Sequence, residues 1–167
     1  MKKLVLFLAL ALLVLGAGCG KKGDSASSQL YMSRTQASDA DAEVSKEVTD
    51  FLKTDLAELS QAKSISVKSY PPVYMAIAQL ADSTNAYACV KESDGVQLLS
   101  SFTLQNKDIV REIVNCEQPD ENTIIIRTNV LDFDYVTSEN SIPMAKPETY
   151  TFVKNDGKWL SDGHERI

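Results

Sequence analysis

Residues 123–136, TIIIRTNVLDFDYV, predict a β-strand and set the fold that we expect for the whole chain. β-branched and aromatic side chains fill this stretch, and such side chains suit a pleated, half-buried surface. Two apolar sets of opposite parity follow each other along it: Ile124, Ile126 and Val130, then Leu131, Phe133 and Tyr135. One inward face cannot hold both sets, because successive side chains of a strand point to opposite faces. We therefore expect a β-bulge near Asn129 or Val130, in a curved sheet.

The C-terminal part of the chain predicts a β-hairpin. Residues 149–154 alternate as a strand does, and the Asn-Asp-Gly sequence at 155–157 is a turn signal before residues 158–160 return. The Asp-Gly pair at 162–163 ends or bends the returning strand. The aromatic side chains that we expect in one layer are Tyr150, Phe152 and Trp159.

The middle of the chain predicts further strands and loops. Residues 96–104 alternate as a strand, and residues 64–70 fit a short strand or an extended link. Residues 109–115 fit either a short helix or a strand, and their two Ile-Val pairs favour the strand. Polar residues and prolines predict loops at 117–122 and 137–148.

Two helices are predicted in the N-terminal half of the domain, on either side of residues 64–70. Residues 39–62 place apolar side chains at spacings of three and four, with charged residues off that stripe. Pro71-Pro72 suits the start of a second helix, which we expect from Val73 to the polar cluster at 82–85, with a continuation to Val90 left open. Helices come first along the chain and antiparallel strands come last. This order predicts an α+β fold, with N-terminal helices packed on one face of a curved antiparallel sheet and a C-terminal hairpin.

The ending Tyr150-x-Phe152-Val153-x-Asn155-Asp156-Gly157-Lys158-Trp159 resembles the closing hairpin of small exported proteins with a nuclear transport factor 2-like or cystatin-like fold. This resemblance implies a cone-shaped sheet with a mouth. In steroid-isomerase relatives of that fold, an aspartate acts as a general base.

The N-terminus has the parts of a secretory signal. Lys2 and Lys3 precede an apolar run at residues 4–15 and small side chains at 16–18. A helix of the run's length reaches only ~18 Å, whereas the hydrocarbon core of a bilayer is ~30 Å thick. We therefore expect residues 1–18 to be a cleaved signal peptide and not a transmembrane span.

The stretch Leu15-Gly16-Ala17-Gly18-Cys19 resembles the lipobox of bacterial lipoproteins. This resemblance implies cleavage before Cys19, an S-diacylglycerol group and an N-acyl chain such as palmitate on that residue, and a permanent anchor in the membrane of the cell envelope. Gly20 in place of aspartate implies the outer membrane, facing the periplasm, if the source is Gram-negative. The alternative is an ordinary cleaved signal followed by a chance cysteine.

The mature chain is acidic and of single-domain size. Residues 19–38, rich in Gly, Ser, Lys and Gln, predict a flexible tether, and residues 39–167 predict one domain. Loss of Lys2 and Lys3 takes the formal charge from −6 to −8. Because nucleic-acid binding needs clustered Lys and Arg, we expect no such partner. The expected partners are the membrane, through the lipid, and an envelope protein, with no cofactor and no metal.

Cys89 and Cys116 remain once Cys19 carries lipid. An even pair in an exported chain predicts one disulfide bond. A catalytic thiol and a metal-binding pair are the alternatives. A nucleophilic cysteine needs a nearby histidine, and the chain has only His164.

The candidate ligand-facing residues are Asp132, Asp134, Tyr150 and Trp159. The two aspartates share one face of the predicted strand. In the mouth of a curved sheet they can serve as a general base, whereas the plainer interpretation is a solvated face of an acidic protein. No nucleophile elbow or phosphate-binding glycine loop is present in the sequence.

Three functions fit these observations. The first is a membrane-anchored binding or assembly module of the bacterial cell envelope. The second is a small-molecule carrier or sensor, and the third is a small enzyme with Asp132 or Asp134 as base. The pocket of a carrier would be lined by some of Phe51, Leu56, Phe133, Tyr150 and Trp159.

Overall fold

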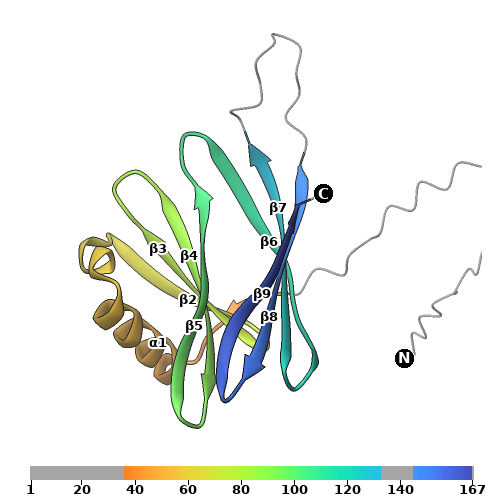
Figure 1. Cartoon of the computed structure of the whole chain (residues 1–167). Coiled ribbons are helices and arrows are strands. Elements are labelled where there is room, and N and C mark those ends of the chain that lie inside the picture. The colour runs from red at the N-terminus through yellow and green to blue at the C-terminus, as the bar shows by residue number, and fades with distance from the viewer. Residues whose placement is uncertain (1–35, 133–144, 167) are drawn as a thin grey trace, which may run out of the picture. The chain divides into compact units, whose positions relative to one another are not determined.

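The computed structural model describes residues 36–132 and 145–166. In these residues the chain forms one α-helix, one 3₁₀-helix and nine strands, and the strands pair in chain order as a single antiparallel sheet (Figure 1). The elements are β1 (Ser38–Asp39), α1 (Ala42–Asp55), η1 (Ala57–Gln61), β2 (Ser64–Tyr70), β3 (Val73–Gln79), β4 (Thr84–Glu92), β5 (Gly95–Gln105), β6 (Ile109–Asp120), β7 (Thr123–Asp132), β8 (Lys146–Asn155) and β9 (Lys158–Arg166). The predicted signal peptide, Cys19 and Asp134 lie outside the described residues.

The sheet folds over between β5 and β6. These strands share one paired position, Gln105 with Val110, whereas β3 and β4 or β7 and β8 pair along most of their length. Strands β2–β5 and β6–β9 therefore form two halves whose inner faces pack together (Figure 1). We call the buried side chains between them the inner layer: Val73, Met75, Ala86, Ala88, Val90, Phe102, Cys116, Ile124, Ile126, Phe152 and Trp159.

Helix α1 covers the other face of the first half. Its spacing of apolar residues places Val48 and Leu52 fully inside, and Leu59 of η1 continues the same contact. We call this second set the helix-side layer: Val48, Leu52, Leu59, Val67, Ala76, Ala78, Tyr87 and Cys89. Strands β3 and β4 thus lie between two apolar layers.

Several predicted elements are confirmed. The helix predicted over 39–62 is confirmed in part: Asp39 belongs to β1, α1 covers 42–55, and the 3₁₀-helix η1 covers 57–61. Residues 64–70 form β2. The hairpin between β8 and β9 turns through Asp156 and Gly157, whose φ angles of 48° and 76° suit a two-residue turn of type I′. The pairing of β8 and β9 shifts register between Thr151 and Phe152, opposite the predicted bend at 162–163.

The second predicted helix is wrong, and the predicted fold class, with helices packed on one face of the sheet, is corrected with it. Residues 73–79 form β3 and residues 84–92 form β4, so the described residues hold a single α-helix and a sheet of nine strands. The reason is burial on both faces. Met75 enters the inner layer and its neighbour Ala76 enters the helix-side layer. Such a strand shows an unbroken apolar run instead of the alternation that identifies a half-buried strand.

The predicted bulge in the 123–136 strand is also wrong. Asn129 and Val130 pair in regular register with both neighbouring strands. The register shifts fall instead on β6, between Ile113 and Asn115 and again between Glu117 and Asp120. Strand β7 keeps one parity inward because Thr128, a polar residue, takes the buried position between Ile126 and Val130.

Two loop predictions are corrected in the same half of the sheet. The strand alternative for residues 109–115 is confirmed, and β6 continues through Asp120 where a loop at 117–122 was expected. The loop expected over 137–148 ends earlier, because β8 begins at Lys146. This correction places Glu148 inside a strand.

Candidate functional site

A buried carboxylate is the centre of a polar cluster in the second half of the sheet. The side chain of Glu148 is 3% exposed. Arg111 Nη2 donates to Glu148 Oε2 at 2.9 Å, and the Tyr150 hydroxyl donates to the same oxygen at 2.7 Å. His164 Nε2 lies 3.9 Å from Oε2, and Arg166 Nε lies 3.5 Å from Oε1. These five residues form the polar cluster, in which a buried charge has the partners that burial demands.

Strand register builds this cluster. Glu148 lies opposite Thr128 on β7 and opposite Arg166 on β9, while Tyr150 lies opposite His164. The rings of Tyr150 and His164 stack with centroids 4.3 Å apart. Cross-strand neighbours share one face of the sheet. The polar cluster therefore continues the inner layer toward the C-terminal end of β9, where Arg166 lies.

The polar cluster is an ion-pair network. Burial alone would raise the pKa of Glu148, but the hydrogen bonds from Tyr150 and Arg111 outweigh it and hold that pKa below the usual 4.5. Burial and the bond to Glu148 raise the pKa of Tyr150 to about 12. A general base works best with a pKa near the operating pH. These shifts move the pKa values of Glu148 and Tyr150 away from neutral pH, so neither group suits that role.

Two buried polar atoms, one within the polar cluster and one next to it, have no hydrogen-bond partner among the described residues. They are Arg111 Nε and Thr128 Oγ1. Thr128 is 1% exposed and follows Ile126 by two positions on the inward face of β7. The second half of the sheet therefore changes from apolar to polar along its length, with some hydrogen-bonding capacity unused.

Trp159 joins the two halves of the sheet. Its indole Nε1 donates to Glu92 Oε1 on β4 at 2.9 Å, and Lys154 Nζ donates to Glu92 Oε2 at 2.6 Å. These two hydrogen bonds lower the pKa of Glu92 below 4.5. Trp159 itself is 8% exposed, so most of its ring belongs to the inner layer.

An open groove runs between α1, the start of β5 and the β8–β9 hairpin, with a volume of about 530 Å³. We call it the edge groove. It is lined by Phe51 and Asp55 of α1, by Asp94 and residues 96–98, and by residues 156–160. Leu160 is 51% exposed there, and Phe51 is half-buried. The edge groove thus offers apolar side chains beside several carboxylates.

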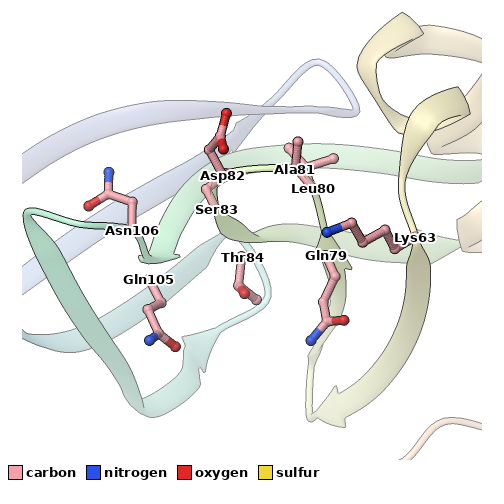
Figure 2. A pocket seen from close by; sticks show the side chains of 9 residues that line it. All are labelled: Lys63, Gln79, Leu80, Ala81, Asp82, Ser83, Thr84, Gln105 and Asn106. Carbon is pink, nitrogen blue, oxygen red and sulfur yellow. The ribbon is translucent and has the colours of Figure 1, made fainter.

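A second hollow of about 370 Å³ lies where the β3–β4 and β5–β6 turns approach each other. Figure 2 shows Lys63 and Gln79 on one side, Gln105 and Asn106 on the other, and the turn at 80–84 between them. Only Leu80 and Ala81 among the lining residues are apolar. This polar hollow has little surface from which water would be released on binding, so we place the candidate site in the edge groove.

The sequence-predicted site residues are not brought together as a set. Tyr150 lies in the polar cluster, and Trp159 lines the edge groove from within the inner layer. Asp132 is the last residue of β7, and Asp134 lies outside the described residues. Phe51 and Trp159, both expected to line the pocket of a carrier, do lie in one groove.

The predicted disulfide is not formed in the structure. Cys89 and Cys116 are free and buried. Cys89 belongs to the helix-side layer and Cys116 to the inner layer, so the two thiols lie in different layers of the fold. Burial raises the pKa of each thiol to about 12, and such thiols are poor nucleophiles.

The described residues hold no group of three or more His, Cys, Asp or Glu side chains that could bind a metal ion. In the same part of the chain, no helix has the length and apolar character needed to cross a membrane. Comparison with known proteins adds no relative: no family model matches the chain, no curated protein matches it, and no solved structure matches it.

Sequence reasoning missed Glu148, Arg111 and the edge groove. A signal for Glu148 was present, because Glu148, Tyr150 and Phe152 share one parity and Phe152 was expected to face inward. The edge groove had no sequence signal, since its three walls come from segments far apart in the chain.

Proposed function

We propose that this chain is a lipid-anchored binding module of the bacterial cell envelope. Cys19 carries the lipid, residues 20–38 act as the tether, and the domain presents the edge groove to an envelope protein. In a Gram-negative source the anchor would lie in the outer membrane and the domain in the periplasm. The observation that carries the proposal is the edge groove, in which a half-exposed leucine and a phenylalanine are open to solvent beside carboxylates.

Physical reasons support binding over catalysis. Exposed apolar side chains release water when a partner covers them, at roughly 25 cal/mol per Å². Leu160 and Val110 are the large apolar side chains most exposed in the described residues, at 51% and 37%. Only Leu160 lies in the edge groove. The polar cluster has its carboxylate saturated by donors and suits a structural role.

The anchor is tested by expressing the full chain with its own signal in a bacterium. We expect detergent-phase partitioning and an intact mass equal to residues 19–167 plus acyl chains. The Cys19→Ser variant should move to the aqueous phase, whereas Cys116→Ser, the matched control, should stay with the detergent. An aqueous wild-type protein without acyl chains would refute the proposal.

The binding face is tested by photo-crosslinking in the same cells. A photoreactive residue at Leu160 should give one light-dependent adduct of defined mass. The same residue at Val110, which is exposed on β6 away from the edge groove, is the control. Equal adducts from both positions, or none from Leu160, would remove the edge groove as the contact face.

A further inference from the structure

The walls of the edge groove are edges of strands. Residues 96–98 of β5 line it consecutively, as do residues 158–160 of β9. A hollow on the face of a strand would touch alternate residues, whereas one along an edge touches successive ones. β5 pairs with β6 only at Gln105, and β9 is the last strand in the sheet order. The backbone of both walls therefore lacks a partner strand along the groove.

A side-chain amide already takes part of the hydrogen bonding of this edge. Gln97 Nε2 donates to the carbonyl oxygen of Gly157 at 3.0 Å. The amide N–H of Trp159 donates to Gln97 Oε1 at 3.3 Å. The side chain of Gln97 therefore already bonds these two backbone groups of the β8–β9 hairpin, so they are not open to a partner's backbone.

The rim of the edge groove is negatively charged. Asp55, Asp94 and Asp156 have no ion-pair partner among the described residues, and Lys158 is the single cation that lines the groove. Nearby carboxylates are neutralised, as in the pair of Glu47 with Lys91 at 2.7 Å. The uncompensated carboxylates favour a cationic partner.

Apolar contact is available between these charges. Phe51, Val96 and Leu98 are half-buried, and Leu160 is 51% exposed. One leucine-sized side chain seated among them would cover the surface that water now contacts. The edge groove thus combines an apolar floor with an acidic rim.

We infer that the edge groove binds a segment of a partner protein that carries leucine-sized side chains flanked by lysine or arginine. This inference rests on the proposed binding function and names the chemistry of its partner. The apolar side chain packs on Phe51 and Leu160, and the flanking cations face Asp94 and Asp156.

The probe is the peptide acetyl-Lys-Leu-Lys-Leu-Lys-amide, added to the mature chain. Trp159 is the chain's only tryptophan and lines the edge groove, so its fluorescence reports occupancy directly. We expect a saturable shift in emission. The charge-reversed peptide with Glu in place of Lys, and the peptide with Ser in place of Leu, should each bind at least tenfold more weakly.

Variants with matched controls locate the site. Asp94→Asn combined with Asp156→Asn should weaken binding about fivefold, since exposed ion pairs contribute little each. Leu160→Ser should weaken it about tenfold. Asp82→Asn, in the turn of the polar hollow, and Val110→Ser should leave affinity unchanged. Each variant is first shown to unfold at the same urea concentration as the wild type.

Two results would overturn the inference. One is equal weakening by Asp82→Asn and by the Asp94/Asp156 pair, which would indicate attraction to an acidic domain as a whole. The other is absence of saturable binding while photo-crosslinking at Leu160 still traps one partner. In that case the binding function stands and only the partner chemistry is wrong. Loss of both the detergent anchor and the crosslink would instead remove the proposed function.

Discussion

Strands β3 and β4 are buried on both faces, whereas β6 to β9 are buried on one face only. In β4 the residues from Ala86 to Val90 are buried in succession. In β7 the buried residues alternate, with Ile124, Ile126, Thr128 and Val130 inside and their neighbours partly exposed. The difference arises because α1 covers the outer face of the first half. A pattern of period two therefore identified strands such as β5 and β8 and failed for β3 and β4.

The largest expected effects test two-sided burial directly. Met75→Asn and Ala76→Asn should each cost about 3 kcal/mol or more in the free energy of unfolding, because neither amide can reach water. In β7, Ile126→Asn should cost a similar amount, but Ile125→Asn, on the outer face, should cost under ~1 kcal/mol. Urea denaturation measures all four. A small effect of Ala76→Asn would refute the burial of β3 on both faces.

Loss of the buried carboxylate of the polar cluster should lower the free energy of unfolding strongly. Glu148→Gln leaves Arg111, 12% exposed, without its counter-charge, so we expect a loss of about 3 kcal/mol. The matched control is Glu117→Gln, which breaks the ion pair between Glu117, 40% exposed, and Arg127, 25% exposed. That change should cost under ~1 kcal/mol. Equal losses in urea denaturation would show that Glu148 acts as an ordinary surface charge.

The same cluster predicts how stability depends on pH. The pKa of Glu148 lies below 4.5 in the folded state, so its contribution is complete above pH 4.5 and is lost as pH falls through the folded value. The pKa of Tyr150 is raised from 10 to about 12, so its contribution is complete below pH 10 and is lost as pH rises toward 12.

The measurement is the unfolding free energy from pH 2 to pH 12. In the plot of unfolding free energy against pH, Glu148→Gln should reduce the fall at acid pH. Tyr150→Phe should reduce part of the fall at alkaline pH. A fall at acid pH that Glu148→Gln leaves unchanged would contradict the lowered pKa.

The smallest expected signal is the reaction of the two buried thiols with an alkylating reagent. The thiols lie in different layers of the fold. With pKa values raised to about 12, Cys89 and Cys116 should react with an alkylating reagent hardly at all in the native state at pH 7. In denaturant without reductant, both should react. Protection that persists in denaturant until reductant is added would instead establish the disulfide that the cysteine count predicts.

Local chemistry explains which elements were predictable. The Asp-Gly turn at 156–157 needs left-handed backbone angles, and α1 carries its apolar stripe on one side. Both signals depend on neighbours within a few residues. β6 was predictable from its β-branched pairs, although its extension to Asp120 was not. The polar cluster joins Arg111 to Glu148 and Arg166, and no local pattern connects such distant residues.

By itself, the sequence determined the lipobox-like start, the acidic charge, the first helix and the closing hairpin, because each depends on residues close together in the chain. Only the tertiary structure decided that residues 73–92 are strands and not a helix. An apolar run fits either conformation, and burial between α1 and the second half of the sheet selected one. The same folding brought α1, β5 and β9 together around the edge groove, whose chemistry exists only where they meet.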